Sequence, residues 1–442
     1  MDKDAYIIQL EEENRSLKQR LAQCEEKLAD LMRRLGLNST NSSKPPAAEG
    51  LAKPPRTQST RGKGKNPSGG QPGHKGHTLE QVLVPDHVIV YDVSVCTVCG
   101  LYLEEHAAVH QSKRQVFDIP EPKIEVTEHQ VLTKICTCGH MNTAAFPVEA
   151  TAPACYGKRI QSMSTYLSNQ HFIPEDRLQD VFKDLFSVSI STGSIATFNA
   201  RLAKAVTPHQ EQLLVDLKAS PVKHLDETGF RIVGKTQWLH VISTPTATHY
   251  RVSEKRKDLE PLKETSGVVV HDHWKSYFKL PDVQHSLCNA HHLRELKALM
   301  EIEKERWAFQ MDRLLRSVNR AGIVCFERVS KIYDQIIQAG LAFHESLCAL
   351  ESGKRKRRVG HNLLIRLRNF KEDVLRFLTT PGVPFTNNQA EQDVRMMKVK
   401  QKISGGFRTT EGAHNFATIR GFISTMRKQN KNILNEIAEQ LA

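Results

Sequence analysis

The sequence predicts a multidomain α+β protein, and three observations lead to this fold class. The chain has 442 residues, which at about 100 to 200 residues per domain is enough for two to four domains. An unbroken heptad pattern occupies the N-terminal end, and a run of short strands precedes a long helical stretch in the C-terminal half. The composition, with 39% hydrophobic and 25% charged residues, fits packed cores and excludes global disorder.

The charge and the cysteine content indicate the cellular compartment of the protein and the kind of partner that it binds. No stretch approaches the roughly 18 to 20 apolar residues of a membrane span, and the acidic N-terminus has no signal-peptide core, so we expect a cytoplasmic protein without a membrane. Nine cysteines are too few for a disulfide scaffold, and close Cys pairs are interpreted as metal ligands or free thiols. The net charge of +13 indicates a polyanionic partner such as nucleic acid, although many basic proteins bind none.

Residues 1–37 are predicted to form a coiled coil. From Ile7 to Leu35 one heptad register holds without a break, and only Asn14 among its a and d positions is polar. A single Asn at an a position costs stability and favours a parallel two-stranded coil. In such a dimer the facing charges Glu13 with Lys18 and Arg20 with Glu25 attract. We therefore expect a homodimer or higher oligomer through residues 7–35. The alternative is an amphipathic helix docked on its own domain.

Residues 38–84 are predicted to be a flexible basic linker. Their content of Pro, Gly, Ser and Asn cannot bury a core. Between residues 44 and 77, seven Lys and Arg residues, among them Lys63 and Lys65, oppose Glu49 alone. A cationic tether of this kind suits contact with the DNA backbone by counterion release. A solvated linker without a ligand is the alternative.

Residues 85–145 are predicted to form a zinc-ribbon-like module. Cys96 and Cys99 lie in CTVCG, and Cys136 and Cys138 lie in CTCGH, with His140 as a further candidate ligand. Four protein ligands leave no open position, so this zinc would be structural. Alternating segments at 87–93, 114–118 and 124–133 predict strands between the two knuckles. The second knuckle is C-x-C instead of C-x-x-C, and unmetallated thiols are the alternative.

Residues 150–205 are predicted to be a helical DNA-binding domain. Helices are expected at 158–169 and 175–186, and a third begins after Ser191 with Thr192 as its N-cap. Its apolar stripe consists of Ile195, Phe198 and Leu202. The third helix of such a helix-turn-helix-like arrangement can enter a major groove. An ordinary helical hairpin without a ligand is the alternative.

Residues 215–442 contain an acidic constellation. Strands are predicted at 222–232, 236–244 and 249–253, followed by the buried strand GVVVHD. Asp226 lies in the first strand and Asp272 ends the fourth. These two strands are neighbours in a ribonuclease-H-like sheet, so the two carboxylates would meet at one edge. In a sheet of that order, the two carboxylates would form the core of an acidic site.

A third carboxylate would complete a site for two Mg²⁺ ions about 4 Å apart. Glu391, in the first turn of a predicted helix, is the best candidate, and Asp393 is the first substitute. Arg395, one turn further on, is placed to hold the carboxylate or contact phosphate.

Each acidic residue also has a simpler interpretation. Asp226 could end a strand, Asp272 could cap a turn, and Glu391 could form a capping box with Asn388. Nearby cations support a nucleic-acid site, because nine Lys and Arg residues between Arg395 and Lys431 oppose one Glu. The DNA-contact candidates among them are Lys398, Lys400, Lys402 and Arg408.

Over nearly its whole length the chain resembles the transposases of the insertion sequence 66 family, which belong to the D-D-E class. The matching segments are LEEENRSLKQRLAQ followed by NSSKPP, GGQPGHKGH, CTVCG, HLDETGF, HDHWKSY, CNAHHLREL and NNQAEQDVRMMKVKQKISGGFRT. The resemblance implies that Asp226, Asp272 and Glu391 are the catalytic triad of a ribonuclease-H-like catalytic domain, with a helical insertion at about 300–385. Cys288 and His291 match a C-x-x-H found after the second Asp in several such elements. We interpret them as supporting residues beside the site, with zinc binding as the alternative.

The resemblance also implies DNA transposition and DNA recombination as the function. The enzyme would cut double-stranded DNA at the ends of a mobile element and join them to target DNA, using Mg²⁺ or Mn²⁺. It would be associated with the nucleoid, and accessory proteins of the same element are compatible with it. A catalytically inactive DNA-binding remnant and a metal-dependent structure-selective nuclease are the alternatives.

The zinc module gives the first testable prediction. Freshly purified, unchelated protein should carry about one zinc ion per chain, because four cysteines form one closed site. Cys96→Ser with Cys99→Ser should remove the ion and make residues 90–145 sensitive to protease. Metal analysis that finds no zinc in the wild type would contradict the assignment.

Overall fold

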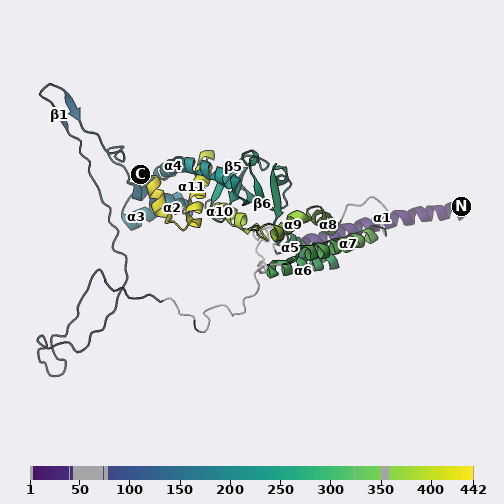
Figure 1. Ribbon diagram of the computed structural model, residues 1–442, viewed down its shortest axis with the longest axis horizontal. Coiled ribbons are helices and arrows are strands. Elements are labelled where there is room, and N and C mark those ends of the chain that lie inside the picture. The colour runs from purple at the N-terminus through teal and green to yellow at the C-terminus, as the bar shows by residue number, and fades with distance from the viewer. Residues whose placement is uncertain are drawn as a thin grey trace. The chain divides into compact units, whose positions relative to one another are not determined.

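The computed structural model describes residues 3–38, 40–42, 73, 78–322, 324–349 and 358–441 (Figure 1). The chain divides into two compact units, one made of residues 1–60 with 128–442 and the other of residues 61–127. Helices and two β-sheets are both present, in agreement with the predicted α+β class. Within the described ranges, no helix is both long and apolar enough to span a bilayer.

The unit of residues 61–127 contains little regular structure in its described part. Residues 78–127 are extended or turning, with one isolated bridge between Val95 and Tyr102. The strands predicted at 87–93 and 114–118 are therefore wrong. The alternating pattern assumed one buried face, but apolar side chains such as Val88 and Val116 are exposed.

A short hairpin follows in the larger unit. Strand β1 (Thr133–Ile135) pairs antiparallel with β2 (Met141–Thr143). The strand predicted at 124–133 is thus wrong except for its last residue. The turn between β1 and β2 contains Cys136 and Cys138, and the Cys136 amide donates to the His140 carbonyl at 2.8 Å. The CTCGH segment therefore forms a tight turn.

Three helices precede the large sheet. Helices α2 (Lys158–Asn169) and α3 (Glu175–Phe186) confirm the predicted ranges. Helix α4 (Thr192–Ala219) has Ser191 as its N-cap, because the Ser191 hydroxyl accepts the Ser194 amide. The prediction that Thr192 is the N-cap is wrong by one residue. The predicted stripe of Ile195, Phe198 and Leu202 is buried in the protein's own core.

The large sheet has five strands in the order β5-β4-β3-β6-β7. Strands β3, β4 and β5 are antiparallel, while β6 runs parallel to β3 and β7 runs parallel to β6. The predicted adjacency of the first and fourth strands is confirmed. The fifth strand, β7, is not among the strands that the sequence predicts. The strand bounds are β3 (Val222–Ile232), β4 (Lys235–Ser243), β5 (Thr248–Ser253), β6 (Gly267–His271) and β7 (Val283–Leu287).

The two faces of the sheet have separate cores. Phe230 and Val241 face helices α10 (Asn388–Ser404) and α11 (Thr410–Lys428). Leu225 and Val269 face the other way, toward the end of α4 and the short helices η2 (Glu260–Leu262) and η3 (Tyr277–Lys279). Because side chains alternate along β3, Asp226 lies on the α10 face and Glu227 on the opposite face. The last helix, α12 (Ile433–Gln440), packs with α4 and α11.

The described part of the interval between β7 and α10 is mostly helical, in agreement with its sequence pattern (Figure 1). Its core includes Trp307, Met311, Tyr333 and Leu364, all nearly inaccessible to solvent. A π-helical turn, Leu299–Glu303, connects the first two helices. The helices are α5 (Asn289–Ala298), α6 (Arg306–Ala321), α7 (Phe326–Ala349), α8 (Val359–Asn369) and α9 (Lys371–Thr379).

Helix α1 (Lys3–Gly36) contacts the rest of its unit at its last turn and through the residues that follow this turn. Arg33 pairs with Glu303 at 3.4 Å, and Asn41 donates to Glu301 at 3.1 Å. By contrast, the apolar heptad side chains are exposed, from 45% at Leu10 to 81% at Leu35. The alternative of an amphipathic helix docked on its own domain therefore describes only the C-terminal end of α1.

The exposed heptad stripe gives the second prediction. A fragment of residues 1–40 should dimerise in parallel, and Asn14→Leu should raise its melting temperature while loosening the preference for two strands. Analytical ultracentrifugation and thermal melting of the two fragments test both statements. A wild-type fragment that stays monomeric at tens of micromolar would rule out the coil.

Candidate active site

Strands β3 and β6 place Asp226 and Asp272 near each other, at the point where the pairing of the two strands stops. Their parallel pairing runs from Val222 with Val268 to His224 with Val270 and then stops. Asp226 follows His224 by two residues, and Asp272 comes directly after the last residue of β6. Strand β3 continues to Ile232, so Asp226 lies in mid-strand beside the end of β6, where the two strands part.

Each of these aspartates is anchored by one oxygen. Asp226 Oδ1 accepts the Glu227 amide, and Asp272 Oδ1 accepts the Trp274 amide, both at 2.9 Å. Within the described residues, neither Oδ2 atom has a hydrogen-bond donor in the protein. One oxygen of each carboxylate is thus left for another ligand.

Asn387 fixes the start of α10 against β3. Its Nδ2 donates to the Leu225 carbonyl at 2.7 Å, and its Oδ1 accepts from His224 Nδ1 at 2.8 Å. The Asn387 amide also donates to Cys288 Sγ at 3.1 Å. Because its side chain is engaged with the strand, Asn387 forms no capping bond although it is the N-cap residue. The alternative of a capping box between Asn388 and Glu391 is therefore wrong.

Glu391, in the first turn of α10, faces the N-terminal turns of α5. Its Oε1 lies 3.8 Å from Cys288 Sγ, 3.7 Å from His291 Nδ1 and 3.7 Å from the nearest nitrogen of Arg294. The structure thus brings Cys288 and His291 to Glu391. Arg395, predicted to hold this carboxylate, is exposed and has no contact with it in the described structure. The cation beside Glu391 comes from α5, which crosses close to the start of α10.

The surroundings of Asp226 and Asp272, called the acidic edge below, oppose ionisation of these two carboxyl groups. Burial, followed by the charges of Glu227, Asp272 and Glu391, raises the pKa of Asp226 well above its usual range. Burial also raises the pKa of Asp272, although the Trp274 amide and Arg256 act in the other direction. Carboxylates that repel one another in this way are stabilised by a bound cation.

The α5 side of the site is neutral apart from Arg294. Burial raises the pKa of the Cys288 thiol to about 12, so this cysteine is protonated at neutral pH. Burial and the neighbouring Arg294 lower the pKa of His291 to about 4, so its ring is uncharged. Neither side chain adds charge beside Glu391.

Two donor sets could hold metal ions. Asp226, Asp272 and Glu391 offer only carboxylate oxygen, which suits Mg²⁺ or Mn²⁺. Within the described ranges, the side chains whose ligand atoms all lie within 4.8 Å of one another are Cys288, His291 and Glu391. Sulfur, nitrogen and oxygen together suit a softer ion, but the Arg294 charge opposes one there. In a two-metal site the three carboxylates need not share one coordination sphere.

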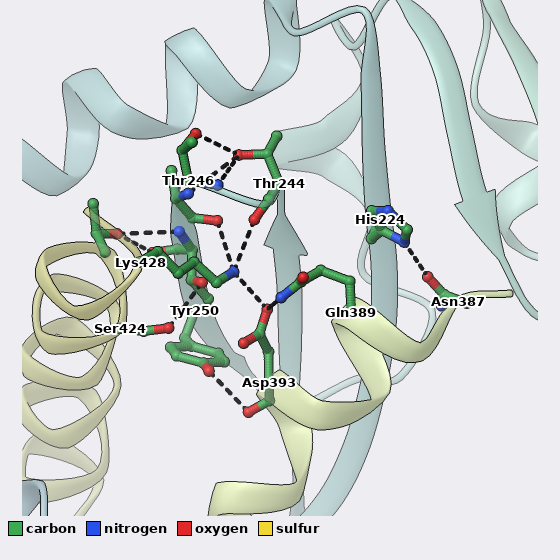
Figure 2. A network of polar contacts seen from close by, with 12 residues as sticks. His224, Thr244, Thr246, Tyr250, Asn387, Gln389, Asp393, Ser424 and Lys428 are labelled. Carbon is green, nitrogen blue, oxygen red and sulfur yellow. Dashed lines mark hydrogen bonds and ion pairs between the residues drawn. The ribbon is translucent and has the colours of Figure 1, made fainter. Parts of the chain in front are cut away.

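Asp393, the substitute for Glu391, has a different environment (Figure 2). Its carboxylate accepts Lys428 Nζ at 2.9 Å and Gln389 Nε2 at 3.1 Å. Lys428 also donates to the carbonyls of Thr244 and Ala247. Figure 2 shows this network joining α10, α11 and the turn between β4 and β5. Asp393 therefore anchors two helices to the sheet and is not available as a third ligand.

The DNA-contact candidates differ in their accessibility. Lys402 and Arg408 are exposed. Lys398 donates to the Gly229 carbonyl, and Lys400 donates to the Ser404 hydroxyl at 3.2 Å. Lys63 and Lys65 lie outside the described residues.

The four candidate zinc cysteines are divided between the two units of the chain. Cys96 and Cys99 belong to the unit of residues 61–127, and Cys136 and Cys138 belong to the larger unit. Backbone amides of Cys99 and Val98 lower the pKa of Cys96, and the Cys138 amide lowers the pKa of Cys136. Each turn thus directs amides toward its first sulfur, as a metal-binding knuckle does.

The five-stranded sheet, its acidic residues and the helices before α10 form an α+β domain with a candidate cation site, and comparison with known families identifies the family of the chain. The model of the Transposase IS66 family matches residues 154–415, more than half of the chain, and the chain belongs to this family. A second model, a family of unknown function (DUF6444), matches residues 3–80. The segment matched by the transposase family model contains Asp226, Asp272 and Glu391.

One curated relative shares a shorter stretch. The uncharacterized protein y4jO of Sinorhizobium fredii is 32% identical over 79 residues, which cover 18% of this chain and 25% of that protein. The chain therefore spans about a quarter of the length of this relative.

The electrostatics of Asp226 give the third prediction. Its pKa is higher in the folded than in the unfolded chain, so the ionised carboxylate destabilises the fold once pH exceeds the unfolded value. In chelator at pH 8, Asp226→Asn should therefore raise the melting temperature by about 2–4 °C per kcal/mol of relieved repulsion. The gain should shrink as pH falls through the folded-state pKa.

Asp184→Asn, at an exposed position of α3, is the control and should leave the melting temperature unchanged. Mg²⁺ should stabilise the wild type more than the Asp226 variant. An Asp226→Asn protein that melts below the wild type at pH 8 would contradict the assignment of strain to this carboxylate.

Proposed function

We propose that the protein cuts DNA at the ends of a mobile element and joins these ends to target DNA by phosphoryl transfer with two divalent cations. The observation that carries the proposal is the position of Asp226 and Asp272, which lie where the pairing of β3 and β6 stops. Glu391 is close enough, from α10, to influence the charge of Asp226. The strand order, three antiparallel strands followed by two parallel ones, supports a ribonuclease-H-like catalytic domain.

The three carboxylates would hold Mg²⁺ or Mn²⁺. Asp226, which is influenced by both other acids, would contribute to both ion positions, while Asp272 and Glu391 would each serve one. Bound there, the cations would promote deprotonation of the attacking oxygen and offset charge on the phosphate during in-line displacement. The anchored Oδ1 atoms orient the two aspartates, so each presents its Oδ2 atom.

Two displacements would follow one another at this site. In the first, water attacks the phosphodiester at the element end, and the bond to the 3′ oxygen breaks, which leaves a 3′ hydroxyl on the element. In the second, that hydroxyl attacks a target phosphodiester and releases a target 3′ hydroxyl. The acidic side chains act through charge and orientation and form no covalent intermediate with DNA.

The remaining segments would bring DNA to the site. Exposed Lys402 and Arg408, with the linker lysines, would contact backbone phosphates. A parallel coil through residues 7–35 would bring two protomers, and hence two element ends, into one assembly. The zinc-ribbon-like module and helices α2 to α4 would add contacts to double-stranded DNA. Accessory proteins of the same element and association with the nucleoid belong to the same proposal.

The fourth prediction concerns the three carboxylates. Asp226→Asn, Asp272→Asn and Glu391→Gln keep side-chain size, but each removes one negative charge from the cation site. A loss of about 4 kcal/mol of transition-state stabilisation would slow cleavage roughly a thousandfold. Binding to element-end DNA in a gel shift should survive, because the phosphate contacts come from cations elsewhere. The activity assay is Mg²⁺-dependent cleavage and strand transfer of labelled element-end DNA.

Glu411→Gln is the matched control, because Glu411 is an exposed acid in the first turn of the next helix. It should cleave within about twofold of the wild type, as surface substitutions usually do. Cleavage by Glu391→Gln at the wild-type rate would show that the third carboxylate lies elsewhere. Cleavage without any joined product would favour a nuclease, and binding without cleavage by the wild type would favour an inactive remnant.

A further inference from the structure

Arg256 is clamped between two tryptophans beside the acidic edge. Its guanidinium carbon lies 5.0 Å from the ring centre of Trp238 and 4.7 Å from that of Trp274. Trp238 comes from β4, and Trp274 follows Asp272 by two residues. Both distances are within cation–π range, and two such contacts together limit the motion of the guanidinium.

Glu227 holds the same guanidinium in its plane. Its Oε1 accepts Arg256 Nε at 2.8 Å and a terminal nitrogen at 2.5 Å, while its other oxygen accepts the Tyr277 hydroxyl. Only 2% of the Glu227 side chain is exposed, compared with 42% for Arg256. Glu227 points to the face opposite Asp226, as strand alternation requires, yet it is buried in a polar network and not in solvent.

This network reaches Asp272 through Trp274. The Trp274 indole stacks on Arg256, and the Trp274 backbone amide is the donor to Asp272 Oδ1. Tyr277, which donates to Glu227, packs edge-on against the same indole with ring centres 5.0 Å apart. The segment from Asp272 to Tyr277 is therefore held at three points, and two of these depend on Arg256 or its partner Glu227.

We propose that Arg256 is a positioning residue for Asp272. By clamping the Trp274 indole, the Arg256–Glu227 pair keeps the Trp274 amide on Asp272 Oδ1 and leaves Asp272 Oδ2 directed to the cation site. The inference rests on the proposed function, since it assigns the role of Asp272 in cation binding. Arg256 acts through Trp274 and has no place among the reacting groups.

The test compares two substitutions that separate charge from shape. Arg256→Lys keeps the positive charge but cannot stack as a plane or bind Glu227 with a fork, whereas Arg256→Gln loses both. Positioning predicts the same defect in both variants. Each should need about tenfold more Mg²⁺ for half-maximal cleavage and cleave about tenfold more slowly at saturation, as partners of metal ligands commonly do. Lys257→Gln, a neighbouring exposed cation, is the control and should match the wild type.

A readout without activity accompanies the kinetics. Trp238 and Trp274 are two of the three tryptophans in the chain, so release of the clamp should change intrinsic fluorescence in both Arg256 variants. In the wild type, Mg²⁺ titration should change this fluorescence, and the midpoint should shift about tenfold in the variants. Glu227→Gln, which keeps the buried shape, is the second variant should Arg256 substitutions fail to fold, and it should shift the midpoint in the same direction.

Several results would overturn the inference. Full rescue by Arg256→Lys would show that charge alone matters. A lower melting temperature with an unchanged Mg²⁺ midpoint would show a structural role, and a weakened gel shift with an unchanged midpoint would show a DNA contact. If Asp272→Asn is inactive while Arg256→Gln behaves as the wild type, only this inference fails. If Asp272→Asn is fully active, the proposed function itself fails.

Discussion

The acidic site of Asp226, Asp272 and Glu391 depends on the hydrogen bonds that the buried side-chain amide of Asn387 makes with strand β3. Strand β6 pairs with β3 only as far as His224, so the next carbonyl, that of Leu225, has no partner in that strand. Asn387 donates to this carbonyl and accepts from His224. An unpaired buried polar group costs about 1–3 kcal/mol, which favours this one docking of α10. Glu391 follows one turn later, so the same contact sets its position relative to Asp226.

The acidic edge is held from both faces of the sheet and from the helices that follow it. On the α10 face, Asn387 and the partly buried pair of Asp393 with Lys428 fix the helix that carries Glu391. On the opposite face, Glu227 and Arg256 hold the segment after Asp272. This support offsets the repulsion among acids that burial intensifies. The surroundings thus preserve an arrangement of charge that is unfavourable until a cation binds.

The sequence could predict elements whose signals are local. Apolar β-branched residues in GVVVH marked a buried strand, and Pro174 marked the start of α3. The sequence could not predict contacts between distant segments, because nothing along the chain shows that α5 lies beside the start of α10. The sequence therefore gives no sign of Arg294 as the cation beside Glu391 and favours Arg395, which is one turn away on the same helix. Asn387 stands within the recognised NNQAEQ segment, but its role depends on where β6 leaves β3.

The central claim is that three segments distant in sequence form one divalent-cation site, and iron-directed cleavage of the protein tests it most directly. Fe²⁺ substitutes for Mg²⁺ at oxygen-rich sites, and with ascorbate and peroxide it generates hydroxyl radicals that cut the nearby backbone. The account predicts cuts close to Asp226, Asp272 and Glu391 together, suppressed by excess Mg²⁺ and lost in Asp226→Asn. Cuts that omit Asp226 and Asp272, or that excess Mg²⁺ leaves unchanged, would contradict it.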